Sequence, residues 1–195
     1  DIQSVNTSDA DIVSAFSAPE VTSVVTWNPQ LGEVKKIPGA TEIFNSSNIP
    51  GEILDLLVVD TATLKANPDL GKALAGIWYE TMTQMSAKTP EGAKARAEMA
   101  ALSGSDVAGY EDQLSTTFMY YTAADAVKAT LDPALVTTMD RVRRFSFENG
   151  LFGKSATSVD AIGIGFPGNK VLGDQNAITL RFDATWMQMA ADGKL

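Results

Sequence analysis

The sequence predicts an α/β protein whose C-terminal half is rich in helices. Two βα units within residues 1–39 and a near-continuous apolar run, ILDLLVV at 53–59, indicate strands of a sheet that is covered on both faces. Between residues 67 and 150, five successive segments have helical spacing of their apolar residues. With 195 residues, of which 45% are hydrophobic, the chain is long enough to bury a real core.

Patterning and capping residues predict the N-terminal elements. Residues 1–6 alternate apolar and polar side chains as a strand does, and residues 8–11 resemble a capping box that opens a short helix. Residues 21–27 are rich in β-branched side chains, which favour a strand. Asn28 and Pro29 then predict the N-cap and the first position of a second short helix.

The five helices that follow are bounded mainly by N-cap residues, prolines and glycines, and then strands return. The predicted helices cover residues 67–87, 89–104, 107–121, 122–131 and 132–149. Strands are predicted at 158–166 and 176–182, and a short helix capped by Asp183 ends the chain. The segment Gly163–Gly168 matches GxGxxG, but Pro167 within it predicts a hairpin turn instead of a dinucleotide site.

The charged residues limit the possible partners and sites. The formal net charge of −9 would repel a polyanion, so we expect no nucleic-acid partner. The cluster Arg141, Arg143 and Arg144 lies near the end of a predicted helix, where cations complement the macrodipole, and we interpret it as a solvated helix end.

The absence of two residue types is more informative than the charge. The chain contains no cysteine and no histidine, which excludes thiol nucleophiles, Ser-His-Asp triads and His or Cys metal ligation within it. We therefore expect a protein that is not an enzyme and that carries no metal or cofactor. The chain contains no apolar window long enough to span a membrane and no signal-peptide pattern, although it does not begin with Met and so can be a processed piece.

Trp27 and Asn28 are candidate ligand-binding residues because of their position. In open α/β sheets, ligands bind beyond the carboxyl ends of strands, where these two residues are predicted to lie. The indole face can stack on a planar group or a cation, and the N–H groups that open the next helix can hold an anion. The alternative is a Trp that closes the end of a local core, and the sequence does not decide between them.

Asp55 and Glu52 are the other two candidate ligand-binding residues. Asp55 interrupts the apolar run at 53–59, and a carboxylate in a buried strand needs a partner such as a bound cation or an arginine. Glu52 is the nearest second carboxylate in the sequence. These four residues form the predicted site.

Several stretches, taken together in their order and spacing, resemble a known family. The chain is similar to the C-terminal part of periplasmic substrate-binding proteins of ABC importers, in the class that serves nitrate, sulfonates and taurine. The nearest group is the one associated with urea carboxylase, which is of urea or guanidine type. The stretches are TWNPQ (26–30), NIPGEILDLLVV (48–59), NPDLGKALAGIWYE (67–80), RRFSFENGLFG (143–153), SVDAIGIGF (158–166) and LRFDATWMQMAADGKL (180–195).

The resemblance implies an incomplete two-lobed fold of the type II periplasmic-binding class. Residues 1–54 would belong to the second α/β lobe, and residues 55–195 would return to the first lobe and complete it. Trp27 and Asn28 would face the cleft between the lobes, and Asp55 would lie at the hinge. Most of the first lobe would be missing from this chain and would be one of its partners.

The resemblance also implies a function. The protein would capture urea or guanidine in the inter-lobe cleft, close around it, and deliver it to the membrane permease subunits. It would lie in the periplasm or be lipid-anchored outside the cytoplasmic membrane. A sulfonate, taurine or nitrate is the alternative ligand within the same class.

Two functions of other classes stay open. One is a carboxylate- or metal-dependent enzyme, for which Glu52 and Asp55 are the nearby acidic pair. The other is a helical interaction module that uses residues 67–150 as a docking surface.

Overall fold

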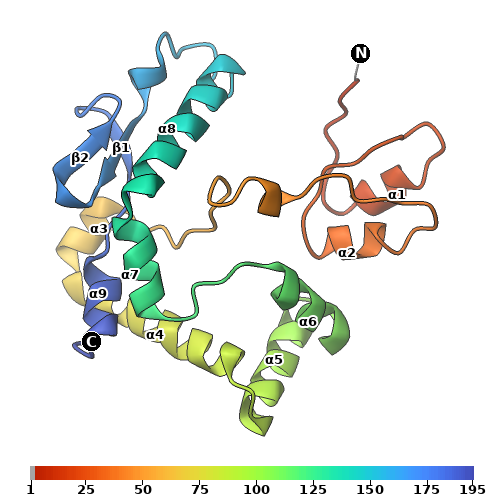
Figure 1. Ribbon diagram of the computed structural model, residues 1–195, viewed down its shortest axis with the longest axis horizontal. Coiled ribbons are helices and arrows are strands. Elements are labelled where there is room, and N and C mark those ends of the chain that lie inside the picture. The colour runs from red at the N-terminus through yellow and green to blue at the C-terminus, as the bar shows by residue number, and fades with distance from the viewer. Residues whose placement is uncertain (1–2) are drawn as a thin grey trace. The chain divides into compact units, whose positions relative to one another are not determined.

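The computed structural model describes residues 3–195 and shows a helix-rich α/β chain (Figure 1). Helices account for 51% of the chain, and three short strands form one mixed sheet, which confirms the predicted α/β class. The chain divides into two compact units. Unit 1 comprises the residues up to Asn45 and Ala87–Met119, and unit 2 comprises Ser46–Ser86 and Tyr120–Leu195. The predicted division into lobes at residue 54 stays a prediction.

The described residues of unit 1 form helices and loops. The two short predicted helices are confirmed, and so are two of the longer ones, although the last ends at Thr116 and not near Tyr121. These helices are α1 (Ile12–Phe16), α2 (Gln30–Val34), α5 (Pro90–Leu102) and α6 (Val107–Thr116). The side chains of Thr89 and Asp106 cap α5 and α6 by accepting hydrogen bonds from Gly92 N and Gly109 N.

The strands predicted in unit 1 are wrong. Residues 21–27 form no strand, and neither do residues 3–6; the first two residues of that predicted strand lie outside the described part. A strand requires a hydrogen-bonded neighbour, and the described residues of unit 1 contain none. β-branched composition alone therefore did not produce a sheet here.

Unit 2 contains five α-helices among its described residues, four of which were predicted. They are α3 (Thr61–Ala66), α4 (Pro68–Ser86), α7 (Ala123–Leu131), α8 (Pro133–Glu148) and α9 (Thr185–Ala191). The unpredicted α3 begins after Asp60, whose Oδ1 accepts from Thr63 N at 2.8 Å. The side chains of Thr122 and Asp132 likewise cap α7 and α8 as predicted.

The sheet of unit 2 has the order β2-β1-β3. β1 (Gly163–Phe166) and β2 (Lys170–Leu172) are antiparallel and are joined by the turn Pro167–Asn169, which confirms the hairpin predicted at GxGxxG. β3 (Ile178–Arg181) pairs with β1 in parallel. Single-turn 3₁₀ helices occur at Ser46–Asn48 (η1), Val159–Ala161 (η2) and in the hairpin turn itself (η3).

The core of unit 2 lies between α8 and the sheet. Met139 of α8 packs with Ile164 and Phe166 of β1, and partly buried apolar side chains from the neighbouring elements surround them. The rings of Phe166 and Phe182 stack with their centroids 5.3 Å apart. The surrounding side chains are Leu54, Leu135, Val136, Val142, Ile162, Leu172, Leu180 and Phe182.

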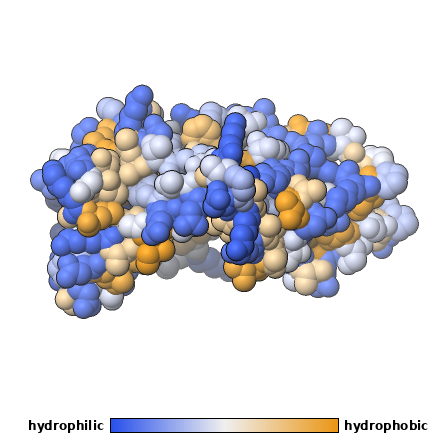
Figure 2. All heavy atoms as spheres, turned by 90° about the horizontal axis from the view of Figure 1, so that it is seen from below, coloured by the Kyte–Doolittle hydropathy of each residue, from blue (hydrophilic) through white to orange (hydrophobic). Residues whose placement is uncertain are grey.

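The buried strand predicted at 53–59 is wrong. These residues form no strand, and Leu54 alone among them packs against the core of unit 2. Ile53, Leu56, Leu57 and Val58 are exposed, and apolar side chains are also visible at the surface in Figure 2. The run has the composition of a strand but pairs with no strand of the described sheet.

Candidate functional site

Trp27 lies in unit 1, directly before α2. Its carbonyl oxygen accepts a hydrogen bond from Leu31 N at 2.8 Å, so its backbone is tied to the first turn of that helix. The residue is 61% exposed, which does not fit a Trp that closes a local core. An exposed indole face on an anchored backbone is available to stack on a planar or cationic group.

Asn28 does not cap α2 as predicted. The N-cap position is Pro29, and no side chain caps the helix. α2 has five residues, so it provides little dipole for an anion, and the predicted anion site at its N-terminus loses its basis. Asn28 itself is partly buried and follows the exposed Trp27.

Gln30 is a polar residue of this segment that sequence reasoning missed. Its side-chain oxygen Oε1 is buried and accepts no hydrogen bond from the described residues. A buried acceptor without a donor costs about 1–3 kcal/mol, so a donor at this position would be stabilising. The sequence carried no signal for it, because a Gln in the first turn of a helix is ordinarily solvated.

Glu52 and Asp55 lie in unit 2 and have different environments. The Glu52 carboxylate accepts a hydrogen bond from Arg141 Nη1 of α8 and forms an ion pair with it. Asp55 is exposed, and no described residue makes a hydrogen bond or an ion pair with its carboxylate. The partner predicted for a buried Asp55 is therefore absent from the described residues, and its exposed position explains why none is required.

The four predicted residues thus form two pairs, each described within its own unit. Unit 1 provides an aromatic face and amide groups at Trp27, Asn28 and Gln30, and unit 2 provides the carboxylates of Glu52 and Asp55. In general, an indole face can stack on planar or cationic groups, and amide or carboxylate oxygens can accept hydrogen bonds from N–H donors.

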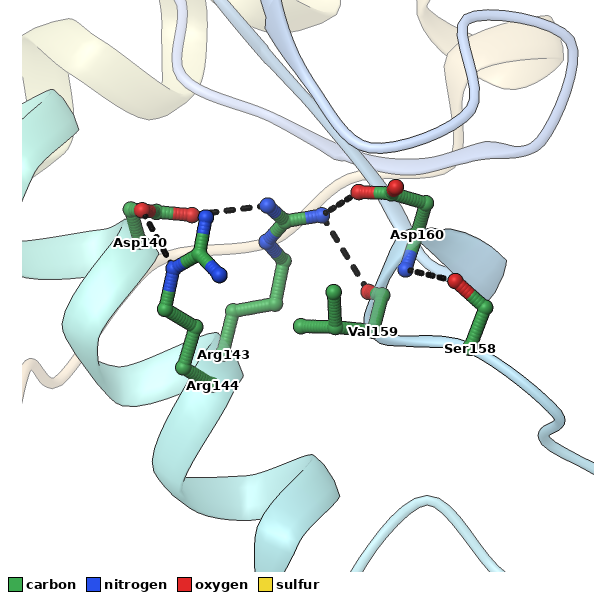
Figure 3. A network of polar contacts seen from close by, with 6 residues as sticks. All are labelled: Asp140, Arg143, Arg144, Ser158, Val159 and Asp160. Atoms are coloured by element: carbon green, nitrogen blue, oxygen red, sulfur yellow. Dashed lines mark hydrogen bonds and ion pairs between the residues drawn. The ribbon is translucent and has the colours of Figure 1, made fainter.

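Arg143 is the centre of a polar network in unit 2 (Figure 3). The residue is 5% exposed, so the predicted solvated helix end is wrong for this arginine. Its Nη2 donates to Asp140 Oδ1 at 2.7 Å, and its Nη1 donates to Asp160 Oδ1 at 2.7 Å and to the Val159 carbonyl at 3.1 Å. The network therefore joins α8 to η2.

Asp140 is held between two arginines. Arg144 Nε donates to Asp140 Oδ2 at 2.8 Å while Arg143 occupies the other oxygen. Hydrogen bonds from Arg143 and Arg144 hold the pKa of the Asp140 carboxyl below its ordinary value. Both Nη atoms of Arg143 are engaged, so this arginine acts as a structural clamp between α8 and η2.

Within residues 3–195, no group of three or more His, Cys, Asp or Glu side chains is arranged to hold a metal ion. In the same residues, no helix is both long and apolar enough to span a bilayer.

Comparison with known proteins found no relative. No protein-family model matches the chain, no curated protein matches it, and no solved structure matches it. The likeness to ABC-importer binding proteins thus stands on the sequence stretches alone.

Proposed function

We propose that the chain is part of the extracytoplasmic binding component of an ABC importer and that its ligand is urea or guanidine. The observation that carries the proposal is the exposed indole of Trp27 on an anchored backbone beside Asn28. Both ligands are small, planar and rich in N–H donors, so they stack on an indole and donate to amide oxygens. The buried Oε1 of Gln30 is a further acceptor in the same segment.

Asp55 distinguishes guanidinium from urea in this proposal. Its exposed carboxylate has no partner among the described residues, so it is available to a cationic ligand. Glu52 already binds a guanidinium group, that of Arg141, and would contact a ligand only by releasing that side chain. We therefore propose that Asp55 pairs with the positive charge of the ligand and that Glu52 contacts the ligand only after releasing Arg141.

The proposal includes a two-lobed fold of the type II periplasmic-binding class. The exposed strand-like run at 53–59 supports it, because this run lacks the neighbouring strands that a first lobe would supply. Ligand bound between the lobes would favour the closed state. The permease subunits in the membrane would then recognise this closed state. The protein would act in the periplasm, and no turnover of the ligand is expected.

A thermal-shift panel tests the ligand class. Guanidine, urea, taurine and nitrate are added separately to this chain and to the protein extended upstream to include a first lobe. We expect guanidine or urea to raise the melting temperature of the extended protein, since a ligand that binds only the folded state stabilises it. Stabilisation by taurine or nitrate alone would replace the proposed ligand with the alternative of the same class.

Matched variants test the two principal residues. Trp27→Leu should weaken binding of guanidine about 5- to 30-fold through loss of the stacking face, whereas Trp78→Leu on α4 should not change it. Asp55→Asn should weaken guanidine and leave urea nearly unchanged, with Asp112→Asn on α6 as its control. Isothermal titration gives the dissociation constants, and an Asp55→Asn variant that binds guanidine normally would remove Asp55 from the site.

A further inference from the structure

Unit 2 contains a cavity of about 290 Å³ that none of the predicted site residues lines. It lies between the turn that joins α7 to α8 and the β1–β2 hairpin, so every residue that lines it belongs to one unit. The apolar lining is Leu131, Pro133, Val136, Phe166 and Pro167. The remainder is Thr130, Asp132, Gly168 and Lys170.

The apolar lining forms the floor of the cavity and adjoins the core of unit 2. Phe166 is buried, and its ring stacks on Phe182. Val136 packs against the same core cluster, which joins the cavity to the most buried part of unit 2. A ligand that places an aliphatic group on this floor would remove its own apolar surface from water at little cost in reorganisation.

The rim carries one charge of each sign. Lys170 is the residue directly opposite Phe166 in the antiparallel hairpin, so both side chains lie on the same face of the sheet. Lys170 is exposed and forms no ion pair with any described residue. Asp132 uses Oδ1 to accept from Ala134 N at 2.8 Å, and its Oδ2 accepts no hydrogen bond from the described residues.

We propose that this cavity binds a small zwitterion with an apolar side chain, of the kind represented by an aliphatic α-amino acid. The carboxylate pairs with the Lys170 ammonium, the ammonium pairs with Asp132 Oδ2, and the side chain rests on the floor at Phe166 and Val136. An anion or a cation alone would leave one rim charge facing a like charge. The site is separate from the proposed importer site and does not depend on that function.

Titration of the ¹⁵N-labelled chain with L-leucine tests the proposal, and two analogues each lack one charge. They are 4-methylpentanoate, without the ammonium, and 3-methylbutylamine, without the carboxylate. We expect L-leucine to shift the amide resonances of the α7–α8 turn and the β1–β2 hairpin. It should bind about two- to fivefold tighter than either analogue, as an exposed ion pair contributes. Glycine, which lacks the apolar group, should bind more weakly than all three.

Variants that each remove one charge test the contacts of Lys170 and Asp132 with the ligand. Asp132→Asn keeps a good N-cap for α8 and should remove the preference for L-leucine over 4-methylpentanoate. Lys170→Met keeps the aliphatic stem and should remove the preference over 3-methylbutylamine, while Lys154→Met should change nothing. Resonance shifts outside the cavity, no shift with L-leucine at 50 mM, or equal affinity for L-leucine in the wild type and Lys170→Met would each overturn the proposal.

Discussion

Units 1 and 2 differ in how they bury apolar side chains. Of the described residues, unit 2 buries Met139, Ile164 and Phe166 in one cluster between a helix and a sheet. The buried apolar residues of unit 1 are Val34 and Ala100, which lie on separate helices.

Strand pairing accounts for the difference. In unit 2, β1 is paired on both sides, so its side chains can form one layer against α8. In unit 1 the β-branched run at 21–27 has no partner strand, and Val25 is 91% exposed. A strand-forming sequence becomes part of a sheet only where a second strand lies within hydrogen-bonding distance.

The largest expected effect comes from removing a core ring of unit 2. Phe166→Ala should lower the free energy of unfolding of unit 2 by about 3–5 kcal/mol, because it deletes buried carbon atoms and leaves a cavity against Phe182. Val34→Ala in unit 1 should lower the free energy of unfolding by about 2 kcal/mol, since it removes two buried carbon atoms.

Hydrogen exchange followed by mass spectrometry checks both changes. Amides of α8 and β1 should lose protection in Phe166→Ala, and those of α2 should lose it in Val34→Ala. Equal losses of amide protection in the two variants would contradict the expected difference in core packing between units 1 and 2.

The next effect concerns the packing of α4 against α9 in unit 2. A Cβ at Gly71 would clash with Cε2 of Trp186, so Gly71→Ala forces the indole to move and should cost about 1–3 kcal/mol. At Gly76 on the same helix, the nearest atom to a new Cβ is Leu195 Cδ1 at 3.7 Å. Gly76→Ala should therefore stabilise α4 by about 0.5–1 kcal/mol through helix propensity.

Thermal unfolding followed by tryptophan fluorescence gives both values. The opposite signs of the two Gly→Ala changes make each the control for the other. If Gly71→Ala were neutral, the close approach of α4 to Trp186 would not contribute to stability.

The sequence predicted the helices well because their ends are local features. Thr89, Asp106, Thr122 and Asp132 each cap the helix that follows through their own side chains. The strand at 53–59 was predicted from composition, which does not tell whether a neighbouring strand is present.

The polar contacts also include some that local spacing predicts and others that only the tertiary fold determines. The pairing of Asp140 with Arg143 and Arg144 follows from spacings of three and four residues on one helix. The contact of Arg143 with Asp160 depends on how η2 packs, and that of Glu52 with Arg141 joins residues 89 positions apart. Such contacts depend on the tertiary fold, so local spacing carried no signal for them.

The smallest expected effect concerns the arginine that joins two elements in each unit. Arg143 joins α8 to η2 in unit 2, and Arg96 joins α5 to α6 in unit 1 through Glu111 Oε1 at 2.6 Å. Hydrogen bonds from Arg143 lower the pKa of Asp140. A carboxyl with a lowered folded-state pKa stabilises the protein above its unfolded-state pKa, near 4, and this contribution is lost as the pH falls through the folded-state value.

Arg143→Met should therefore reduce the loss of stability between pH 5 and pH 2 relative to the wild type. Thermal unfolding measured at pH 7, 5, 3 and 2 gives this dependence of stability on pH. Arg141→Met, which alters a largely exposed arginine, should change the free energy of unfolding at pH 7 by less than about 0.5 kcal/mol. An unchanged slope in Arg143→Met would mean that Arg144 alone sets the pKa of Asp140, and the network would then act on stability only through packing.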